Sequence, residues 1–84
     1  MKYRVLLSRS ARKQLERLSG ETEDRVLTKL SALESNPRPA GCKKLTNRDA
    51  WRIRVGDYRV IYEIHDNILQ VIVVTVGHRR EVYR

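Results

Sequence analysis

The chain has 84 residues, with 18 Lys or Arg against 10 Asp or Glu, and its formal net charge is +8 at pH 7. This length allows one small domain, residues 1–84, and excludes a nucleotide-binding domain with a separate substrate domain. A single cysteine cannot form an internal disulfide, and one Cys with two His is too few for a structural zinc site. We therefore expect no metal and no cofactor. No apolar run is long enough to cross a membrane, so the expected compartment is the cytoplasm.

The N-terminal residues predict a short strand and a first helix. Apolar side chains occupy every second position from Tyr3 to Leu7, as in a strand. Apolar residues then recur at helical spacing over residues 11–18, after Ser8 or Ser10, either of which can cap a helix. We expect Gly20 to end this helix in a left-handed conformation.

A second helix is expected to begin near Glu21 or Thr22. Acidic residues crowd its first turn, where the helix dipole favours anions, and Val26, Leu30 and Leu33 form its apolar stripe. Because only a few residues separate the two helices, they should form an antiparallel hairpin.

The chain after Gly41 predicts β-structure. A loop with two prolines over residues 35–41 separates it from the helices. Alternating strands are expected over residues 51–55 and 58–65, with a tight turn at Gly56 and Asp57, and a possible edge piece at 44–46. Residues 68–76 are apolar at nearly every position, which is typical of a strand covered on both faces.

The element order predicts an α+β fold. It consists of a short N-terminal strand, a two-helix antiparallel hairpin and a three- to four-stranded antiparallel sheet, with the helices packed on one sheet face. Trp51, Tyr62 and their apolar neighbours suit that face as core residues. Strand alternation then places Arg52, Arg54 and Arg59 together on the opposite face.

The charge pattern agrees with this arrangement. Residues 38–59 carry a net charge of +5 and residues 77–84 carry +2, whereas residues 60–76 are net acidic. Three clustered arginines repel one another and have no structural use, so they favour a phosphate or RNA backbone as partner. The alternative is that they are solvated or paired with Glu63, the one plausible carboxylate on that face.

Two segments of this chain resemble one known family. They are Trp51-Arg52-Ile53-Arg54-Val55-Gly56-Asp57-Tyr58-Arg59-Val60-Ile61-Tyr62 and Val76-Gly77-His78-Arg79-Arg80-Glu81-Val82-Tyr83. Together with the two-helix N-terminal half, they resemble the RelE/ParE toxin superfamily of type II toxin–antitoxin modules, and in particular its RelE-like mRNA interferase branch. The resemblance implies the RelE-like microbial RNase fold.

For the RelE branch, the resemblance implies a metal-independent endoribonuclease that cleaves mRNA in the A site of the 70S ribosome and so inhibits translation. The ribose 2′-OH attacks the adjacent phosphate and leaves a 2′,3′-cyclic phosphate, which requires a base, cationic stabilisation and an acid. It also implies an acidic cognate antitoxin that covers the basic face and thereby regulates growth.

The resemblance carries five residues over as catalytic. Arg52 and Arg54 match two basic residues on the RNA-facing strand, and Arg59 matches a phosphate-stabilising arginine. Arg79 matches an arginine that stabilises charge or assists the leaving group. Tyr83 matches a tyrosine near the substrate that can act as the base, since a cationic surround lowers the pKa of a phenol.

Five further residues are candidates for RNA binding: Lys43, Lys44, Arg48, His78 and Arg80. The first three can touch ribosomal RNA or simply keep a loop soluble. Family members often have Lys where Arg52 and Arg54 stand, and Arg cannot serve as a base. That role therefore falls to Tyr83 or to His78, which as a lone histidine is otherwise a turn residue.

The sequence leaves two other functions open. A ParE-like protein shares the fold and inhibits DNA gyrase without nuclease activity, and it need not keep the tail with Arg79 and Tyr83. An inactive binding module would use its charge only to bind antitoxin or RNA.

Overall fold

The computed structural model of the chain describes residues 2–78. It contains two helices, one short 3-10 helix and five strands. In chain order these are β1 (Arg4–Leu7), α1 (Arg9–Glu16), α2 (Gly20–Ala32), β2 (Lys43–Lys44), β3 (Trp51–Val55), β4 (Tyr58–His65), η1 (Asp66–Ile68) and β5 (Gln70–His78). The predicted α+β fold is confirmed.

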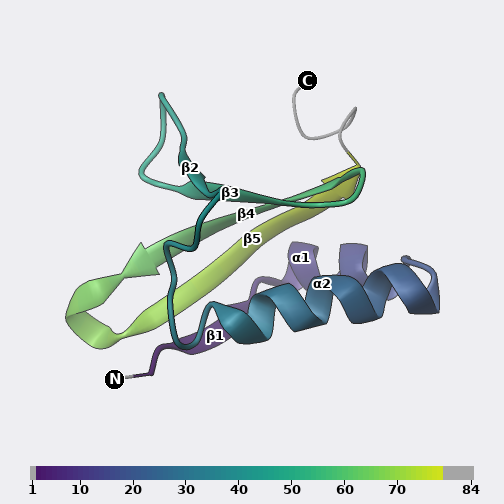
Figure 1. The fold of residues 1–84 in the computed structure, drawn as a ribbon, viewed down its shortest axis with the longest axis horizontal. Helices are drawn as coiled ribbons and strands as arrows, with labels where there is room; N and C mark the ends of the chain where they lie inside the picture. Colours follow the sequence, from purple (N-terminus) through teal and green to yellow (C-terminus); the bar gives the residue numbers. More distant parts are fainter. Residues whose placement is uncertain (1, 79–84) are drawn as a thin grey trace.

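The five strands form one mixed sheet in the order β1-β5-β4-β3-β2 (Figure 1). Strands β2 to β5 pair in antiparallel fashion, as predicted. However, β1 pairs with β5 in parallel, with Arg4 opposite Gln70 and Leu7 opposite Val73. The predicted three- to four-stranded antiparallel sheet did not include this parallel pair, because its partners lie at opposite ends of the sequence.

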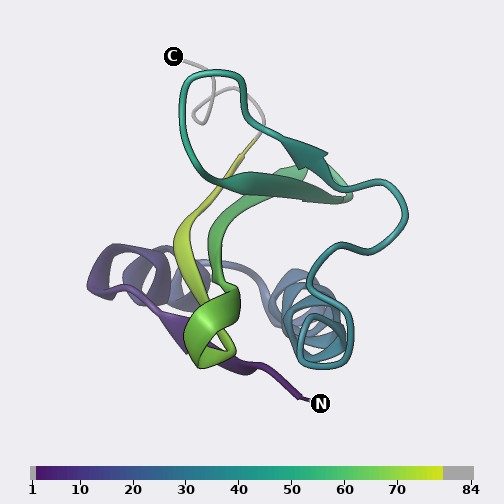
Figure 2. The same cartoon turned by 90° about the vertical axis from the view of Figure 1, so that its left-hand side faces the viewer.

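Both helices lie on the same side of the sheet (Figure 2) and run in opposite directions, as predicted for a hairpin. Ser8 caps α1, since its Oγ accepts a hydrogen bond of 3.0 Å from the Ala11 N–H. The prediction for Gly20 is wrong: this residue begins α2 after Ser19 and does not have a positive φ. Among the glycines of residues 2–78, positive φ values occur at Gly41 (+91°) and at Gly56 (+59°), which lies in the β3–β4 turn.

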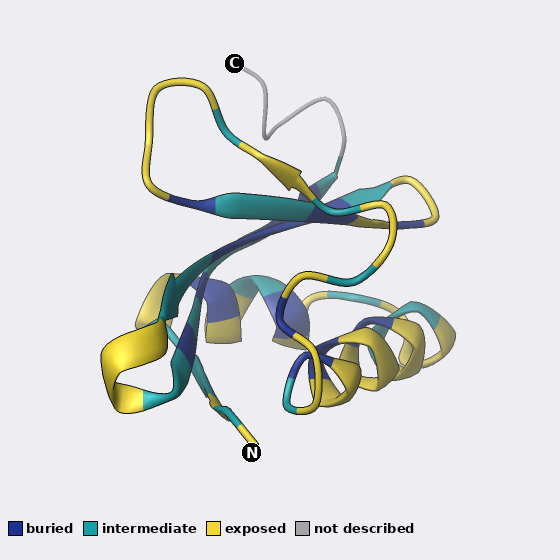
Figure 3. Ribbon diagram, turned by 60° about the vertical axis from the view of Figure 1, so that its left-hand side comes forward, coloured by how far each residue is buried: buried dark blue, intermediate teal, exposed yellow. Residues whose placement is uncertain are grey.

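The core fills the space between the helices and the sheet (Figure 3). It joins the apolar stripes of both helices to the helix-facing side chains of β3, β4 and β5, as the alternation predicts. Its buried members are Ala11, Leu15, Val26, Leu30, Leu33, Ile53, Val55, Val60, Tyr62, Val71, Val73 and Val76. Trp51 is half-buried against them.

Strand β5 is buried on one face more completely than on the other. Val71 and Val73 are fully buried under the helices, whereas Ile72 and Val74 on the other side are only half-buried. The prediction that both faces are covered is therefore wrong for these residues.

A bulge changes the side to which the end of β5 points. Ile61 lies opposite Thr75, but the next residue, Tyr62, lies opposite Val73, so β5 contains one extra residue at Val74. Without the bulge, alternation from Val73 would place residues 75 and 77 on the helix side. With the bulge, Val76 and His78 face the helices instead.

An ion pair and a hydrogen bond connect the proline loop and the N-terminal segment to η1. The Arg38 Nη2 lies 2.9 Å from Asp66 Oδ2, and the Tyr3 hydroxyl donates a hydrogen bond to Asp66 Oδ1. The Arg38 guanidinium also stacks over the Trp51 ring, 5.1 Å from its centroid. The hydrogen bonds from Arg38 and Tyr3 lower the pKa of the Asp66 carboxyl below its ordinary value.

A second, buried contact anchors the same loop. The Tyr62 hydroxyl donates a 2.7 Å hydrogen bond to the Pro37 carbonyl. The Tyr62 side chain is fully buried, and this burial raises the pKa of its hydroxyl far above its ordinary value. Tyr62 is therefore a neutral structural donor and cannot act as a base.

Tyr62→Phe should lower the free energy of unfolding by about 1–3 kcal/mol, because the buried Pro37 carbonyl loses its donor. Urea denaturation would measure the change. Tyr58→Phe is the matched control, since the Tyr58 hydroxyl has no hydrogen-bond partner within residues 2–78. Equal losses in the two variants would contradict a special role for the Tyr62 hydroxyl.

Asp66→Asn should destabilise the protein at neutral pH and cease to do so in acid. A carboxyl with a depressed folded pKa stabilises the fold above its unfolded pKa, and this stabilisation is lost as pH falls through the folded value. Urea midpoints of wild type and variant should therefore converge as the pH falls through the depressed folded pKa. Asp57→Asn, at an exposed turn residue without an ion pair in the described chain, is the control. A difference that stays constant with pH would refute the assignment.

Candidate nucleic-acid interface

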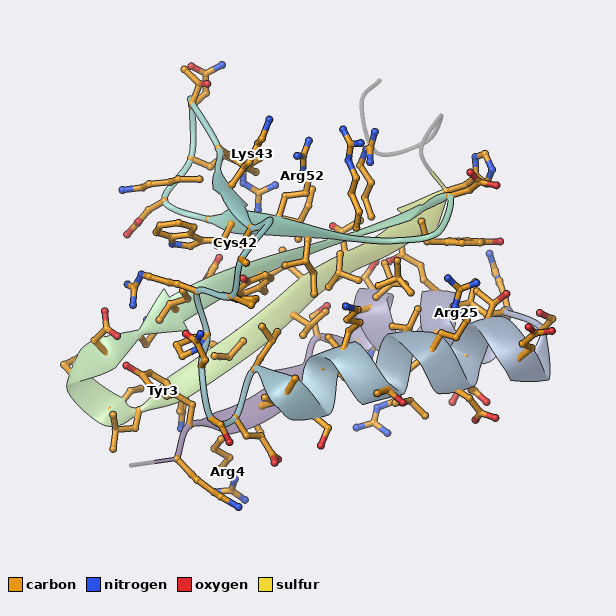
Figure 4. All side chains as sticks on the ribbon, viewed as in Figure 1. Tyr3, Arg4, Arg25, Cys42, Lys43 and Arg52 are labelled. Carbon is orange, nitrogen blue, oxygen red and sulfur yellow. The ribbon has the colours of Figure 1, made fainter. Side chains whose placement is uncertain are left out.

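Four basic residues share the sheet face that points away from the helices, which we call the arginine face: Lys43, Arg52, Arg54 and Arg59. Their alignment follows from the strand register. Lys43 on β2 lies opposite Arg52 on β3, and Arg54 on β3 lies opposite Arg59 on β4. Directly opposed residues have Cβ atoms about 5 Å apart and project to the same side. Figure 4 shows Lys43 and Arg52 projecting from this side of the sheet. The predicted grouping of Arg52, Arg54 and Arg59 is confirmed.

Arg59 differs from its neighbours in its burial. Its exposed fraction is 5%, and it is the one buried charged residue among residues 2–78. Arg52 is half-buried and Arg54 is exposed. Gly77 lies opposite Arg59 on β5 and has no side chain to compete for the space beside it. Burial removes a guanidinium from water at considerable cost, so this position is one where a fixed cation has a purpose.

Glu63 also lies on this side of β4, but its carboxylate contacts His65. The His65 Nε2 lies 3.0 Å from Glu63 Oε1, and both side chains are substantially exposed. Glu63 lies four positions along β4 from Arg59, which corresponds to about 13 Å. The Glu63–His65 pair therefore marks the far end of the face, distant from its cationic end at Arg54 and Arg59.

Lys44 and Arg48 flank the arginine face. Lys44 lies opposite Trp51, and its Nζ is 3.7 Å from Asp49 Oδ1 in an ion pair whose side chains are 56% and 93% exposed. Such an exposed pair contributes little to stability. Arg48 is exposed in the loop between β2 and β3. Both residues are accessible for contact with a polyanion.

His78 lies on the helix side of the sheet, away from the arginine face. It is opposite Tyr58, with the two ring centroids 5.5 Å apart in an edge-to-face arrangement. Together with Gln14, Arg17 and other residues it lines a pocket of about 260 Å³ beside α1. The bulge at Val74 causes this placement, and nothing in the sequence pattern indicated the bulge.

Residues 2–78 offer no metal site of the usual kind. No group of three or more His, Cys, Asp or Glu side chains is placed there to hold a metal ion. No helix in this part of the chain is long and apolar enough to cross a membrane.

The family model described as the ParE toxin of the type II toxin–antitoxin system parDE matches residues 5–83. This chain belongs to the RelE/ParE toxin superfamily. It is thus a toxin of the type II toxin–antitoxin class, and the predicted superfamily is confirmed. No curated protein sequence matches it.

Solved structures of RelE toxins are similar to this superfamily member over nearly the whole chain. The archaeal RelE–RelB complex from Pyrococcus horikoshii has a chain with 30% identity and a TM-score of 0.85, covering 94% of this chain and 97% of that one. A chain of the RelBE2 complex from Mycobacterium tuberculosis has 27% identity and a TM-score of 0.83, and the match covers 94% of this chain and 100% of that one. The isolated RelE toxin of Escherichia coli has 27% identity and a TM-score of 0.81, and the match covers 96% of this chain and 90% of that one.

Three predicted site residues of the toxin, Arg79, Arg80 and Tyr83, lie outside the described residues. They follow His78, the last residue of β5, in the sequence.

Arg38 has a structural role that the sequence pattern did not indicate. It lies between the two prolines of the loop and contacts both Trp51 and Asp66. Since Trp51 begins β3, these contacts hold the loop against the strand that supplies Arg52 and Arg54. The flanking prolines, which restrict the backbone, were the signal that could have indicated a fixed position.

Arg54→Gln should raise the free energy of unfolding by up to about 1 kcal/mol at low salt, because it removes a like charge directly opposite Arg59. The gain should shrink as salt is added, since screening weakens the repulsion. Urea denaturation at several salt concentrations would measure both effects. Arg4→Gln is the control, because Arg4 is an exposed strand arginine opposite the uncharged Gln70. The same gain in both variants would show that net charge alone is responsible.

Proposed function

We propose that this toxin is a metal-independent endoribonuclease that cleaves mRNA in the ribosomal A site and so inhibits translation. The observation that carries this proposal is the nearly complete burial of the Arg59 guanidinium beside Arg52 and Arg54 on one sheet face. The similarity to RelE chains at 27–30% identity supports the same branch of the superfamily.

The proposed reaction needs fixed positive charge. The 2′-oxygen of a ribose forms a bond to the adjacent phosphorus while the bond to the 5′-oxygen of the next nucleotide breaks. A base takes the 2′-OH proton, and an acid gives one to the departing 5′-oxygen, so that the products are a 2′,3′-cyclic phosphate and a 5′-OH. Negative charge accumulates on the phosphoryl oxygens in between. Guanidinium groups held in place before the reaction stabilise this charge with little reorganisation.

The position of the tyrosines favours Tyr83 as the base. Of the chain's four tyrosines, Tyr3 donates to Asp66, Tyr62 is buried in the core and Tyr58 lies on the helix side. None of these three reaches the arginine face. His78 is also on the helix side, and His65 is six strand residues from Arg59, or about 20 Å. We therefore assign the base to Tyr83 and leaving-group assistance to Arg79.

The proposed partners follow from the charge of the arginine face and from the relatives. The similar chains from P. horikoshii and M. tuberculosis come from toxin–antitoxin complexes. We propose that an acidic cognate antitoxin covers the basic surface of this toxin until it is released. Lys43, Lys44 and Arg48 then contact ribosomal RNA in the cytoplasm.

Expression of the toxin from a tightly controlled promoter should produce new 5′ ends within translated reading frames, in phase with codons. Arg59→Met should reduce these cuts by about a hundredfold or more, because it removes the fixed cation but fills the same space. Sequencing of mRNA 5′ ends would measure the cuts. Tyr83→Phe should abolish them through loss of the base.

Arg4→Met is the matched control, because it removes an arginine from the opposite edge of the sheet and should leave cleavage intact. Thermal unfolding of Arg59→Met would verify that the fold is preserved. The match to the ParE family model supports a second candidate function, inhibition of DNA gyrase. Intact messages accompanied by gyrase-linked DNA breaks would replace the nuclease proposal with that one.

A further inference from the structure

A second basic site lies between α2 and β3, which we call the α2–β3 cleft. It has a volume of about 390 Å³ and is lined by Arg25, Thr28, Lys29, Arg54, Val55 and Gly56. A neighbouring hollow of about 280 Å³ extends it toward the proline loop and shares Lys29 and Arg54 with it. Three cationic residues thus line one cleft, and no acidic residue within residues 2–78 lines either hollow.

Two of these cations come from one face of α2. Arg25 and Lys29 are four residues apart, so they are neighbours on the helix surface, where like charges destabilise a helix slightly. Neither they nor Arg54 form an ion pair with a carboxylate among residues 2–78. The cleft therefore keeps the positive charges of Arg25 and Lys29 together, with Arg54 at its edge, and no counterion comes from the described chain.

The Arg25 side chain is directed toward the sheet. Figure 4 shows it between α2 and the β3–β4 turn. A Cβ at Gly56 would lie 3.6 Å from Nη1 of Arg25, so the guanidinium rests directly over this turn. The glycine allows this close approach, which holds the planar donor group at the cleft wall.

The cleft is continuous with the arginine face through Arg54. This residue lies opposite Arg59 on the sheet and also lines both hollows. Strand β2 pairs only with Trp51 and Arg52, so Arg54 lies on the part of β3 that β2 does not cover. The arginine face and the cleft thus meet at Arg54, at the edge of β3.

From this continuity we propose that the α2–β3 cleft binds a backbone phosphate of the same RNA strand whose scissile phosphate lies on the arginine face. The inference rests on the proposed function. Guanidinium and ammonium donors without an acidic neighbour suit a phosphate, and Arg in particular binds phosphate through two parallel hydrogen bonds. Two basic surfaces that share Arg54 favour one polyanionic strand over a separate acidic protein. The cleft positions the RNA and takes no part in the chemistry.

The test is binding of a short, single-stranded 2′-O-methyl RNA, which cannot be cut because its 2′-oxygen is blocked. Arg25→Glu/Lys29→Glu should weaken binding by about tenfold at low salt. The slope of log K against log salt should fall by about 0.7 for each phosphate that the variant no longer neutralises. On unmodified mRNA with ribosomes, the same variant should raise KM and leave kcat within about twofold.

Arg9→Glu/Lys13→Glu is the matched control. It reverses the same residue types at the same spacing on the exposed surface of α1, away from the cleft. It should change RNA affinity by less than about threefold and leave the salt slope nearly unchanged. Thermal unfolding would show that both variants are folded, and Arg25→Gln/Lys29→Gln would replace the cleft variant if it were not.

Two results would overturn the inference. Equal reductions of RNA affinity in the cleft and control variants would show only a general charge effect. Unchanged RNA binding together with impaired neutralisation by the acidic antitoxin would assign the cleft to a protein partner. A wild-type chain that binds RNA without cutting mRNA would refute the proposed function separately, because the binding comparison still decides the cleft.

Discussion

Packing of α1 and α2 against a single face of the sheet is the constraint on which the rest of the structure depends. The helix stripes bury the inward side chains of β3, β4 and β5, including the fully buried Val60, Tyr62 and Val73. Because side chains alternate along a strand, every position between these must point to the other face. Arg52, Arg54 and Arg59 occupy such positions. The core thus determines both the stability of the domain and the location of its charge.

The resulting arginine face destabilises the fold. Arg54 and Arg59 are directly opposed like charges, and the Arg59 guanidinium is almost completely removed from water. Both features suit a surface that binds a polyanion. Binding of an antitoxin or RNA to this face would stabilise the toxin by mass action. A cation held rigidly by burial is also the arrangement that electrostatic catalysis requires.

The contacts around the proline loop connect this face to the rest of the molecule. Arg38 forms an ion pair with Asp66 in η1 and stacks over Trp51 at the start of β3. The buried Tyr62 hydroxyl donates a hydrogen bond to the Pro37 carbonyl. These contacts hold the segment leading to β2 beside β3, where Lys43 adds to the arginine face. At the other end of β3, where β2 no longer pairs, Arg54 is shared between that face and the α2–β3 cleft. A single strand therefore contributes residues to two adjoining basic surfaces.

The sequence by itself determined the order of the elements, the inward and outward positions of β3 and β4, and hence the grouping of Arg52, Arg54 and Arg59. These features depend on local periodicity, which contacts between near neighbours enforce. Only the tertiary structure decided the parallel pairing of β1 with β5, the burial of Arg59 and the side on which His78 lies. Each depends on hydrogen-bond register or packing between segments distant in sequence. The bulge at Val74 is the clearest case, because one extra residue reverses the direction of every side chain after it.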